Sequence, residues 1–341
     1  MRFSDFDQRL ASLGALPVHR DRIMRMWLRG QPLDMGTRRR ASENFLPLTV
    51  RDSIPSLTAE LDALARIRSE HPGSDGSRLL VELADGQLVE SVLLPRDGLC
   101  VSTQVGCAVG CRFCMTGKSG LLRQVSSMEI AAQVVLARRL RPVKKVVFMG
   151  MGEPAHNLEN VLEAIDLLGI EGNIGHKNLV FSTVGDMRVF DALPRQRVKP
   201  ALALSLHTTK ADLRRHLLPR APNIAPEELV ELSEKYARDT QYPIQYQWTL
   251  LKGVNDGDDE LDAVANLLKG KFGVLNIIPF NSLDGDDYQR PDANRIREIV
   301  HSLQQRGVLT KIRNSAGQDV DAGCGQLRAR ASKRIWPTRT E

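Results

Sequence analysis

The chain has 341 residues, of which 42% are hydrophobic and 26% are charged. This length and apolar content are sufficient for a buried core, which excludes disordered and fibrous proteins. No run approaches the roughly 18 consecutive apolar residues of a membrane helix, and the N-terminus lacks the basic and then apolar pattern of a secretion signal. We therefore expect a cytoplasmic protein without a membrane association.

The charge balance is mildly basic. Lys and Arg number 47 and Asp and Glu number 41, so the net charge is +6, with a pI near 9.2. Such a surplus is compatible with a polyanionic partner such as RNA. It is equally compatible with an ordinary soluble surface, so charge alone does not identify a nucleic-acid-binding protein.

The first part of the chain predicts two small units. Residues 1–75 show helical spacing of apolar residues and are expected to form an accessory helical module with possible RNA contacts. Within them, Ser69–Gly76 contains Pro, Gly and Asp and is expected to be a loop. Two alternating runs around Asp85-Gly86 then predict a β-hairpin extension over residues 77–96.

From residue 97 to residue 327, short β-branched runs alternate with helical patterns, which is typical of repeated β–α units around a parallel sheet. Six such units predict an α/β fold with a partial (β/α)6 barrel, short of the eight units of a TIM barrel. Residues 328–341 are basic and are expected to form a tail. The predicted strands are Leu99–Gln104, Lys145–Gly150, Leu179–Val184, Ala201–Leu206, Ile244–Leu250 and Val274–Phe280, with a last strand near Thr310–Arg313; the predicted helices are Met128–Leu140, Glu159–Leu168, Pro226–Arg238, Asp259–Leu268 and Arg295–Gln305.

Three of the five cysteines lie within eight residues. Cys107, Cys111 and Cys114 have the spacing C-x3-C-x2-C. Three thiolates can bind three irons of a [4Fe–4S] cube and leave the fourth iron open for chemistry. A structural zinc site normally has four ligands, often in two paired halves, and no second half is present in the sequence. The two remaining cysteines, Cys100 and Cys324, could simply be small buried apolar residues.

Polar residues follow several of the predicted strands at their carboxyl ends. In β/α barrels this rim carries the active site, so these residues predict a cofactor pocket. Taken one at a time, His207 or Ser182 would more often be a structural residue. The motifs at these strand ends contain Gly152, Glu153, Ser182, Ser205, Leu206, His207 and Asn281.

The cysteine motif, with Phe113 before Cys114, resembles the radical SAM signature. Longer stretches resemble a narrower group, the RlmN/Cfr family of RNA adenine methyltransferases that act on C2 or C8. The similarity spans about residues 77 to 327. The matching stretches are Val89–Pro95, Leu99–Cys107, Phe148–Pro154, Ser205–His207, Leu251–Asp256, Ile278–Asn281 and Asp319–Leu327.

This resemblance implies one [4Fe–4S] cluster on Cys107, Cys111 and Cys114, and two molecules of S-adenosylmethionine per turnover. It also implies that S-adenosylmethionine is bound by Gly152, Glu153, Ser182, Ser205, Leu206, His207 and Asn281. It also implies a substrate in rRNA or tRNA, and an electron donor such as flavodoxin or ferredoxin. We expect the protein to act as a monomer. A ring carbon of adenine is a poor nucleophile, which is the physical reason for radical chemistry instead of polar methyl transfer.

The resemblance also implies roles for three further residues. Cys324 would carry the methyl group as S-methylcysteine. Cys100 would resolve the protein–RNA adduct, leaving a transient Cys100–Cys324 disulfide, and Glu90 would accept the proton of the ring. The alternative for Glu90 is a charge on the water-facing side of its strand. The glycines that flank Cys324 suggest a mobile loop.

Some residues depart from the family pattern, among them Ala155-His156 and Gly323. These departures leave the RNA target open. The alternatives are methylation of C8, a radical SAM enzyme with a small-molecule or protein substrate, and an iron–sulfur sensor without catalysis.

Overall fold

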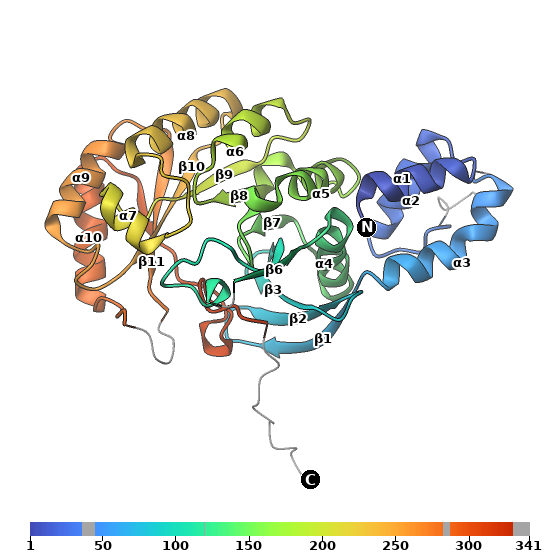
Figure 1. Cartoon of the computed structure of the whole chain (residues 1–341), viewed down its shortest axis with the longest axis horizontal. Helices are drawn as coiled ribbons and strands as arrows, with labels where there is room; N and C mark the ends of the chain where they lie inside the picture. Colours follow the sequence, from blue (N-terminus) through green and yellow to red (C-terminus); the bar gives the residue numbers. More distant parts are fainter. Residues whose placement is uncertain (36–44, 119, 282–286, 330–341) are drawn as a thin grey trace, which may run out of the picture.

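The computed structural model describes residues 1–35, 45–118, 120–281 and 287–329. In it, ten strands form one open, curved sheet (Figure 1). The order of the strands in this sheet is β1-β2-β3-β4-β7-β8-β9-β10-β11-β12. The strands from β4 to β12 run parallel, and β1 to β3 extend the sheet antiparallel from β4. Within the described residues β1 and β12 do not pair, so the barrel is partial, as predicted. The strands are β1 (Ala65–Pro72), β2 (Ser77–Leu83), β3 (Leu88–Leu94), β4 (Gly98–Cys100), β7 (Lys145–Phe148), β8 (Leu179–Thr183), β9 (Ala201–Ser205), β10 (Ile244–Leu250), β11 (Gly273–Pro279) and β12 (Thr310–Ile312).

Helices cover the outer face of this sheet, and three N-terminal helices lie together beside α4 and α5 (Figure 1). The five helices predicted within the barrel are all present. The structure contains two further helices, α6 and α7, which the sequence pattern did not predict. The helices are α1 (Phe3–Ser12), α2 (Pro17–Leu28), α3 (Leu48–Asp62), α4 (Ser127–Leu140), α5 (Leu158–Ile170), α6 (Met187–Ala192), α7 (Ala211–Leu217), α8 (Pro226–Thr240), α9 (Asp258–Leu268) and α10 (Ala293–Gln305).

The strands from β7 to β11 are buried on both faces, which explains why their sequences are nearly continuous apolar runs. The core they form continues into the N-terminal helices. Phe6 and Leu10 of α1 and Trp27 of α2 belong to the same buried cluster as Phe148 and Phe181 of the sheet. The N-terminal helices therefore pack on the barrel through a shared core.

The predicted loop at Ser69–Gly76 is wrong over its first four residues. Ser69–Pro72 belong to β1, whose residues pair with β2 from Ala65 to Pro72. Because β1 is an edge strand, its charged side chains alternate toward water and a proline is tolerated at its end. These two properties hid the strand in the sequence.

The first predicted barrel strand, Leu99–Gln104, is shorter than expected. It divides into β4 and a separate strand β5 (Gln104–Gly106), which pairs with β6 (Leu121–Gln124) in a two-stranded sheet. At the break, the amide of Gln133 binds both backbone groups of Ser102, accepting from its N–H at 2.9 Å and donating to its carbonyl at 2.9 Å. This side chain replaces a neighbouring strand, so the backbone can leave the sheet there.

Candidate functional site

The site lies at the carboxyl ends of the parallel strands. Gly152 and Glu153 follow β7, Ser182 is the penultimate residue of β8, and Ser205 ends β9. Leu206 and His207 continue from β9, and Asn281 follows β11 soon after its last residue. The structure therefore brings the residues predicted for cofactor binding to one rim, together with the loop that carries the three clustered cysteines.

The cysteine loop is folded tightly against the barrel. Gly110 has φ +69°, and a Cβ on Gly117 would lie 2.8 Å from the Cα of Gly110, so the loop backbone packs against itself where only glycine fits. The Arg220 guanidinium donates to the Ala108 carbonyl at 2.8 Å, and the Arg112 N–H donates to the Leu217 carbonyl at 3.0 Å. These bonds fix the loop to the end of α7.

The three thiols lie close together, with Cys107 buried and Cys111 and Cys114 partly buried. Burial raises the pKa of Cys107 to about 12 and also raises the pKa of Cys111 and of Cys114, and the neighbouring thiols of the cluster add to the rise for Cys107 and Cys111. Thiolates at this place therefore need a positive partner. Among the described residues, no three His, Cys, Asp or Glu side chains are arranged to hold one metal ion. In an iron–sulfur cube each thiolate binds a different iron, so this finding does not conflict with a cluster.

Glu153 is held beside the cysteine loop. Its carboxylate accepts hydrogen bonds from the N–H groups of Ala155 at 3.2 Å and Val184 at 3.1 Å, and burial raises its pKa to about 7. Its own N–H donates to the side chain of Gln104 at 2.8 Å. Next to it, Gly152 has φ +105°, and a Cβ there would lie 2.6 Å from the Cβ of Gln104. Only glycine fits at this point of the rim.

His207 is a buried neutral imidazole. Its Nδ1 accepts the N–H of Thr249 at 3.0 Å, and its ring meets the ring of Phe113 edge to face at 4.9 Å. Burial lowers its pKa to about 3. Asn255 donates to the His207 carbonyl at 2.7 Å, which holds a residue that has φ +64°. His207 therefore supports the cysteine loop through Phe113. Leu206 is fully buried in the core, and its N–H donates to the Gln247 carbonyl at 3.1 Å.

Arg214 is a site residue that the sequence analysis missed. It lies on α7, is only 3% exposed, and donates to the carbonyls of Val184 and Ser205. Burial lowers its pKa to about 10, and the nearby Cys111 and Glu153 oppose that change. The only sequence feature at this position is an arginine on the inner side of a short helix, which does not distinguish a buried arginine from a surface one.

The buried polar atoms at the rim that have no hydrogen-bond partner among the described residues include Nε of Arg214 and Oδ1 of Asn281. A guanidinium donor suits a carboxylate, and an amide oxygen suits an ammonium group. S-adenosylmethionine carries both groups. The chemistry of the donor set, three thiols beside one free cationic donor and one free acceptor, therefore fits an iron–sulfur cluster with this cofactor.

The Cys324 segment closes onto the cysteine loop. The carbonyl of Gly325 accepts the N–H of Met115 at 2.7 Å, and the carbonyl of Leu327 accepts the Thr116 hydroxyl at 2.7 Å. Asn281 donates to the Cys324 carbonyl at 3.0 Å. A Cβ on Gly325 would lie 2.9 Å from the Phe113 carbonyl. The glycine next to Cys324 thus allows a close approach between two backbones, a role that the expectation of a mobile loop did not include.

Cys324 is exposed and Cys100 is buried, and both are free thiols. Burial, and after it the nearby Cys324 thiol, raises the pKa of Cys100 to about 12. Cys324 also contributes to the raised pKa of Cys114, for which burial is the main cause. The exposed thiol is therefore close enough to interact with Cys100 on one side and with the cysteine loop on the other.

Glu90 is fully buried, so the alternative of a water-facing charge is wrong. Its carboxylate pairs with the buried guanidinium of Arg78, and it accepts the N–H of Arg328 at 2.8 Å. Its carbonyl accepts the Ser102 hydroxyl at 2.6 Å. Glu90 thus connects the β-hairpin to the segment that follows Cys324.

The chain is similar to one known superfamily and to proteins named as probable RNA methyltransferases. Residues 101–267 match the model of the radical SAM superfamily. The chain is 82% identical to a probable RNA methyltransferase of Bordetella avium over 97% of this chain and 95% of that protein. It is 70% identical to a probable RNA methyltransferase of Pseudomonas aeruginosa over 98% of this chain and 96% of that one.

Among solved structures, a radical SAM methyltransferase from Sphaerobacter thermophilus matches with a TM-score of 0.84 and 32% identity, over 97% of this chain and 98% of that chain. Among the described residues, no helix is both long enough and apolar enough to cross a bilayer.

Proposed function

Because the chain belongs to the radical SAM superfamily, we propose that it is an RNA methyltransferase that methylates C2 of an adenine in rRNA or tRNA. Two relatives that cover nearly the whole chain are named as probable RNA methyltransferases. The surplus of basic residues is compatible with RNA as the substrate.

In this proposal, Cys107, Cys111 and Cys114 hold a [4Fe–4S] cluster, which supplies the electron that cleaves S-adenosylmethionine reductively. Arg214 and Asn281 each offer a buried polar atom without a partner among the described residues. We assign the cofactor's carboxylate to Arg214 and its ammonium group to Asn281. Gly152 and Glu153 form the adjoining wall, with Ser182, Ser205, Leu206 and His207 around it.

Cys324 accepts a methyl group from one S-adenosylmethionine and loses its thiol proton. The S-methyl group of Cys324 would give one hydrogen atom to the 5′-deoxyadenosyl group released from a second S-adenosylmethionine, and its carbon would then join C2 as a Cys324–CH2–adenine adduct. The electron left over when C2 loses its proton would return to the cluster. Glu90 accepts the proton that C2 loses. The Cys100 thiolate then attacks the sulfur of Cys324, and the S–CH2 bond breaks with its electron pair on the carbon. That carbon takes a proton and becomes the new methyl group, and an external reductant restores the two thiols.

The observation that carries this proposal is the position of Cys324. Cys324 is exposed, its carbonyl accepts the side-chain N–H of Asn281 at 3.0 Å, and the next residue accepts the N–H of Met115 at 2.7 Å, so its segment lies against the cysteine loop. Its thiol also lies near enough to contribute to the raised pKa of Cys100 and of Cys114. A thiol that first receives a methyl group beside the cofactor and later reacts with a second thiol needs both neighbours.

The first test compares nucleosides by mass spectrometry in separated rRNA and tRNA from cells with and without the gene. Loss of 2-methyladenosine from one pool supports the proposal and identifies the RNA. Loss of 8-methyladenosine would keep the chemistry and change the ring position. No change in either nucleoside would refute an adenine substrate.

A second test uses the two proposed redox thiols. Cys100→Ala should trap a covalent adduct between protein and RNA, visible as a shifted band in a denaturing gel, and Cys100→Ala with Cys324→Ala should not. The matched metal test is Cys111→Ala, which should lose the visible absorption of the reconstituted cluster. Normal turnover by Cys100→Ala without an adduct would contradict its resolving role.

A further inference from the structure

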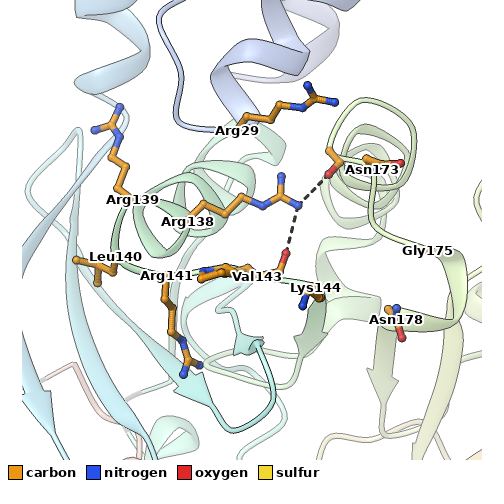
Figure 2. Close-up of a pocket in the computed structure, with 12 residues that line it drawn as sticks. Arg29, Arg138, Arg139, Leu140, Arg141, Val143, Lys144, Asn173, Gly175 and Asn178 are labelled. Carbon is orange, nitrogen blue, oxygen red and sulfur yellow. Dashed lines mark hydrogen bonds between the residues drawn. The ribbon is translucent and has the colours of Figure 1, made fainter.

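A basic cavity of about 620 Å³ lies where the end of α2 meets the segments that lead into β7 and β8 (Figure 2). None of the described residues that line it is acidic. Five of them are basic, namely Arg29, Arg138, Arg139, Arg141 and Lys144. This concentration of positive charge lies at the opposite end of the strands from the candidate active site and plays no part in the proposed reaction.

Arg138 forms the inner wall of the cavity. Its guanidinium donates to the carbonyls of Leu28 at 2.8 Å, Gly172 at 2.8 Å and Val143 at 3.3 Å. A guanidinium has five N–H donors, so these bonds leave two donors unused. Burial, and then the nearby Arg29, lowers the pKa of Arg138. The two cations are therefore near each other, and the described residues that line the cavity with them include no carboxylate.

Arg29 lines the same cavity near Arg138. It is exposed at the C-terminus of α2, and its side chain makes no hydrogen bond or ion pair within the described residues. Figure 2 shows the side chain of Arg29 above that of Arg138, with both side chains extending to the same side. All five donors of Arg29 are thus free to bind a ligand.

The other three cations are already engaged. Arg139 pairs with Asp62 at 2.7 Å, and Lys144 pairs with Asp97 at 2.8 Å. Arg141 donates to backbone carbonyls, including that of Gly98 at 2.9 Å. Backbone carbonyls carry no formal charge, so the uncompensated charge of the cavity belongs to Arg29, Arg138 and Arg141.

We propose that Arg29 and Arg138 bind a phosphodiester group in the backbone of the RNA substrate. This inference rests on the proposed function, because it assigns a second contact to that same RNA. Two guanidinium groups facing one opening match the oxygens of a phosphate, which arginine binds in a bidentate manner. Most contacts between proteins and nucleic acids go to the phosphate backbone, and they position the substrate without reading its sequence.

The occupant must be a long polyanion if the same molecule also reaches the active site. β7 has four residues, and a strand rises about 3.3 Å per residue, so the two rims lie at least about 13 Å apart. A mononucleotide cannot extend over that distance and also present its base. A structured RNA can present the adenine at one rim while its backbone reaches the other.

The test measures binding of a fluorescently labelled RNA hairpin by anisotropy between about 50 and about 200 mM salt. One phosphate contact changes the slope of the logarithm of the RNA association constant against the logarithm of the salt concentration by about 0.9. This slope corresponds to roughly an eightfold change in RNA affinity between about 0.1 M and 1 M salt. We therefore expect Arg29→Gln to bind roughly eightfold more weakly at about 0.1 M salt, with a slope smaller by about 0.9.

Arg297→Gln is the matched control, since Arg297 is an exposed arginine on α10, at the other end of the sheet from α1–α3 (Figure 1). It should change neither affinity nor slope. A short RNA that reaches only the active-site rim should bind the wild-type and Arg29→Gln proteins equally. Methylation of that short RNA should also be unchanged.

The proposed function and the phosphate contact can be refuted separately. If the wild-type protein neither binds nor methylates RNA, the proposed function is wrong and this inference falls with it. If the wild-type protein methylates the hairpin and Arg29→Gln binds it as tightly as Arg297→Gln does, only the phosphate contact is refuted. If inorganic phosphate or ATP binds in an Arg29-dependent manner while RNA binding does not depend on Arg29, the cavity takes a small anion and the RNA assignment is wrong.

Discussion

The ion pair between Arg78 and Glu90 gives the sharpest prediction about stability. Glu90 is fully buried and Arg78 is 5% exposed, so removing one partner leaves the other charged group uncompensated in the interior. Breaking such a pair typically costs about 3–5 kcal/mol, whereas replacing both partners costs much less. We expect Arg78→Met and Glu90→Gln each to lower the free energy of unfolding by about 3 kcal/mol or more.

The double variant should lose far less than the sum of the two single losses, with a coupling energy of about 3 kcal/mol. The measurement is a double-mutant cycle by urea unfolding, with the cluster reconstituted identically in all four proteins. The Arg66–Glu82 pair on neighbouring strands is the exposed control, and Arg66→Met should leave stability unchanged. Single losses that add to within about 0.5 kcal/mol would refute the reasoning, because independent sites behave in that way.

Three further predictions concern the rim and α4. Gly152→Ala should lower the free energy of unfolding by about 2–5 kcal/mol, because the backbone there has φ +105° and a new Cβ would collide with Gln104. Gly253→Ala should cost only about 1–2 kcal/mol, because Gly253 has φ +67° but faces open space. Equal decreases in the temperature of thermal unfolding for the two variants would contradict this expectation. His207 stays neutral in the folded protein, with a pKa of about 3, while its unfolded pKa is near 6.5. The stability conferred by the neutral ring is therefore complete above about pH 6.5, and it is lost as the pH falls toward 3, by up to about 1.4 kcal/mol per pH unit. The free energy of unfolding of His207→Asn, measured with urea, should not show this dependence on pH. Ser126→Ala removes the N-cap of α4 and should cost about 1 kcal/mol by urea unfolding, and an unchanged midpoint would contradict the capping role.

Much of the barrel could be predicted because local pattern and tertiary environment agree there. The strands β7 to β11 are buried on both faces, so their apolar runs are visible without knowledge of their neighbours. Glycines and polar residues at the strand ends likewise identified the rim. By contrast, β1 alternates between charged and partly buried residues and ends in proline, so its pattern resembles that of a loop.

The contacts that depend on distant parts of the chain could not be predicted. The sequence around Arg214 does not predict that its guanidinium is buried and donates to the Ser205 carbonyl at the end of β9. The same is true of the hydrogen bond between Arg328 and Glu90, whose partners are 238 residues apart. Such contacts follow from the assembled sheet, and local spacing contains no information about them.

The closure of the Cys324 segment over the cysteine loop has a consequence for the order of events during synthesis. Cys114 leaves the ribosome 210 residues before Cys324 (324 − 114), and translation at about 5–20 residues per second separates them by about 10–40 s. Throughout that interval the bonds from Met115 and Thr116 to the later segment cannot exist. The three clustered thiols of the nascent chain are therefore accessible before its own C-terminal segment can cover them.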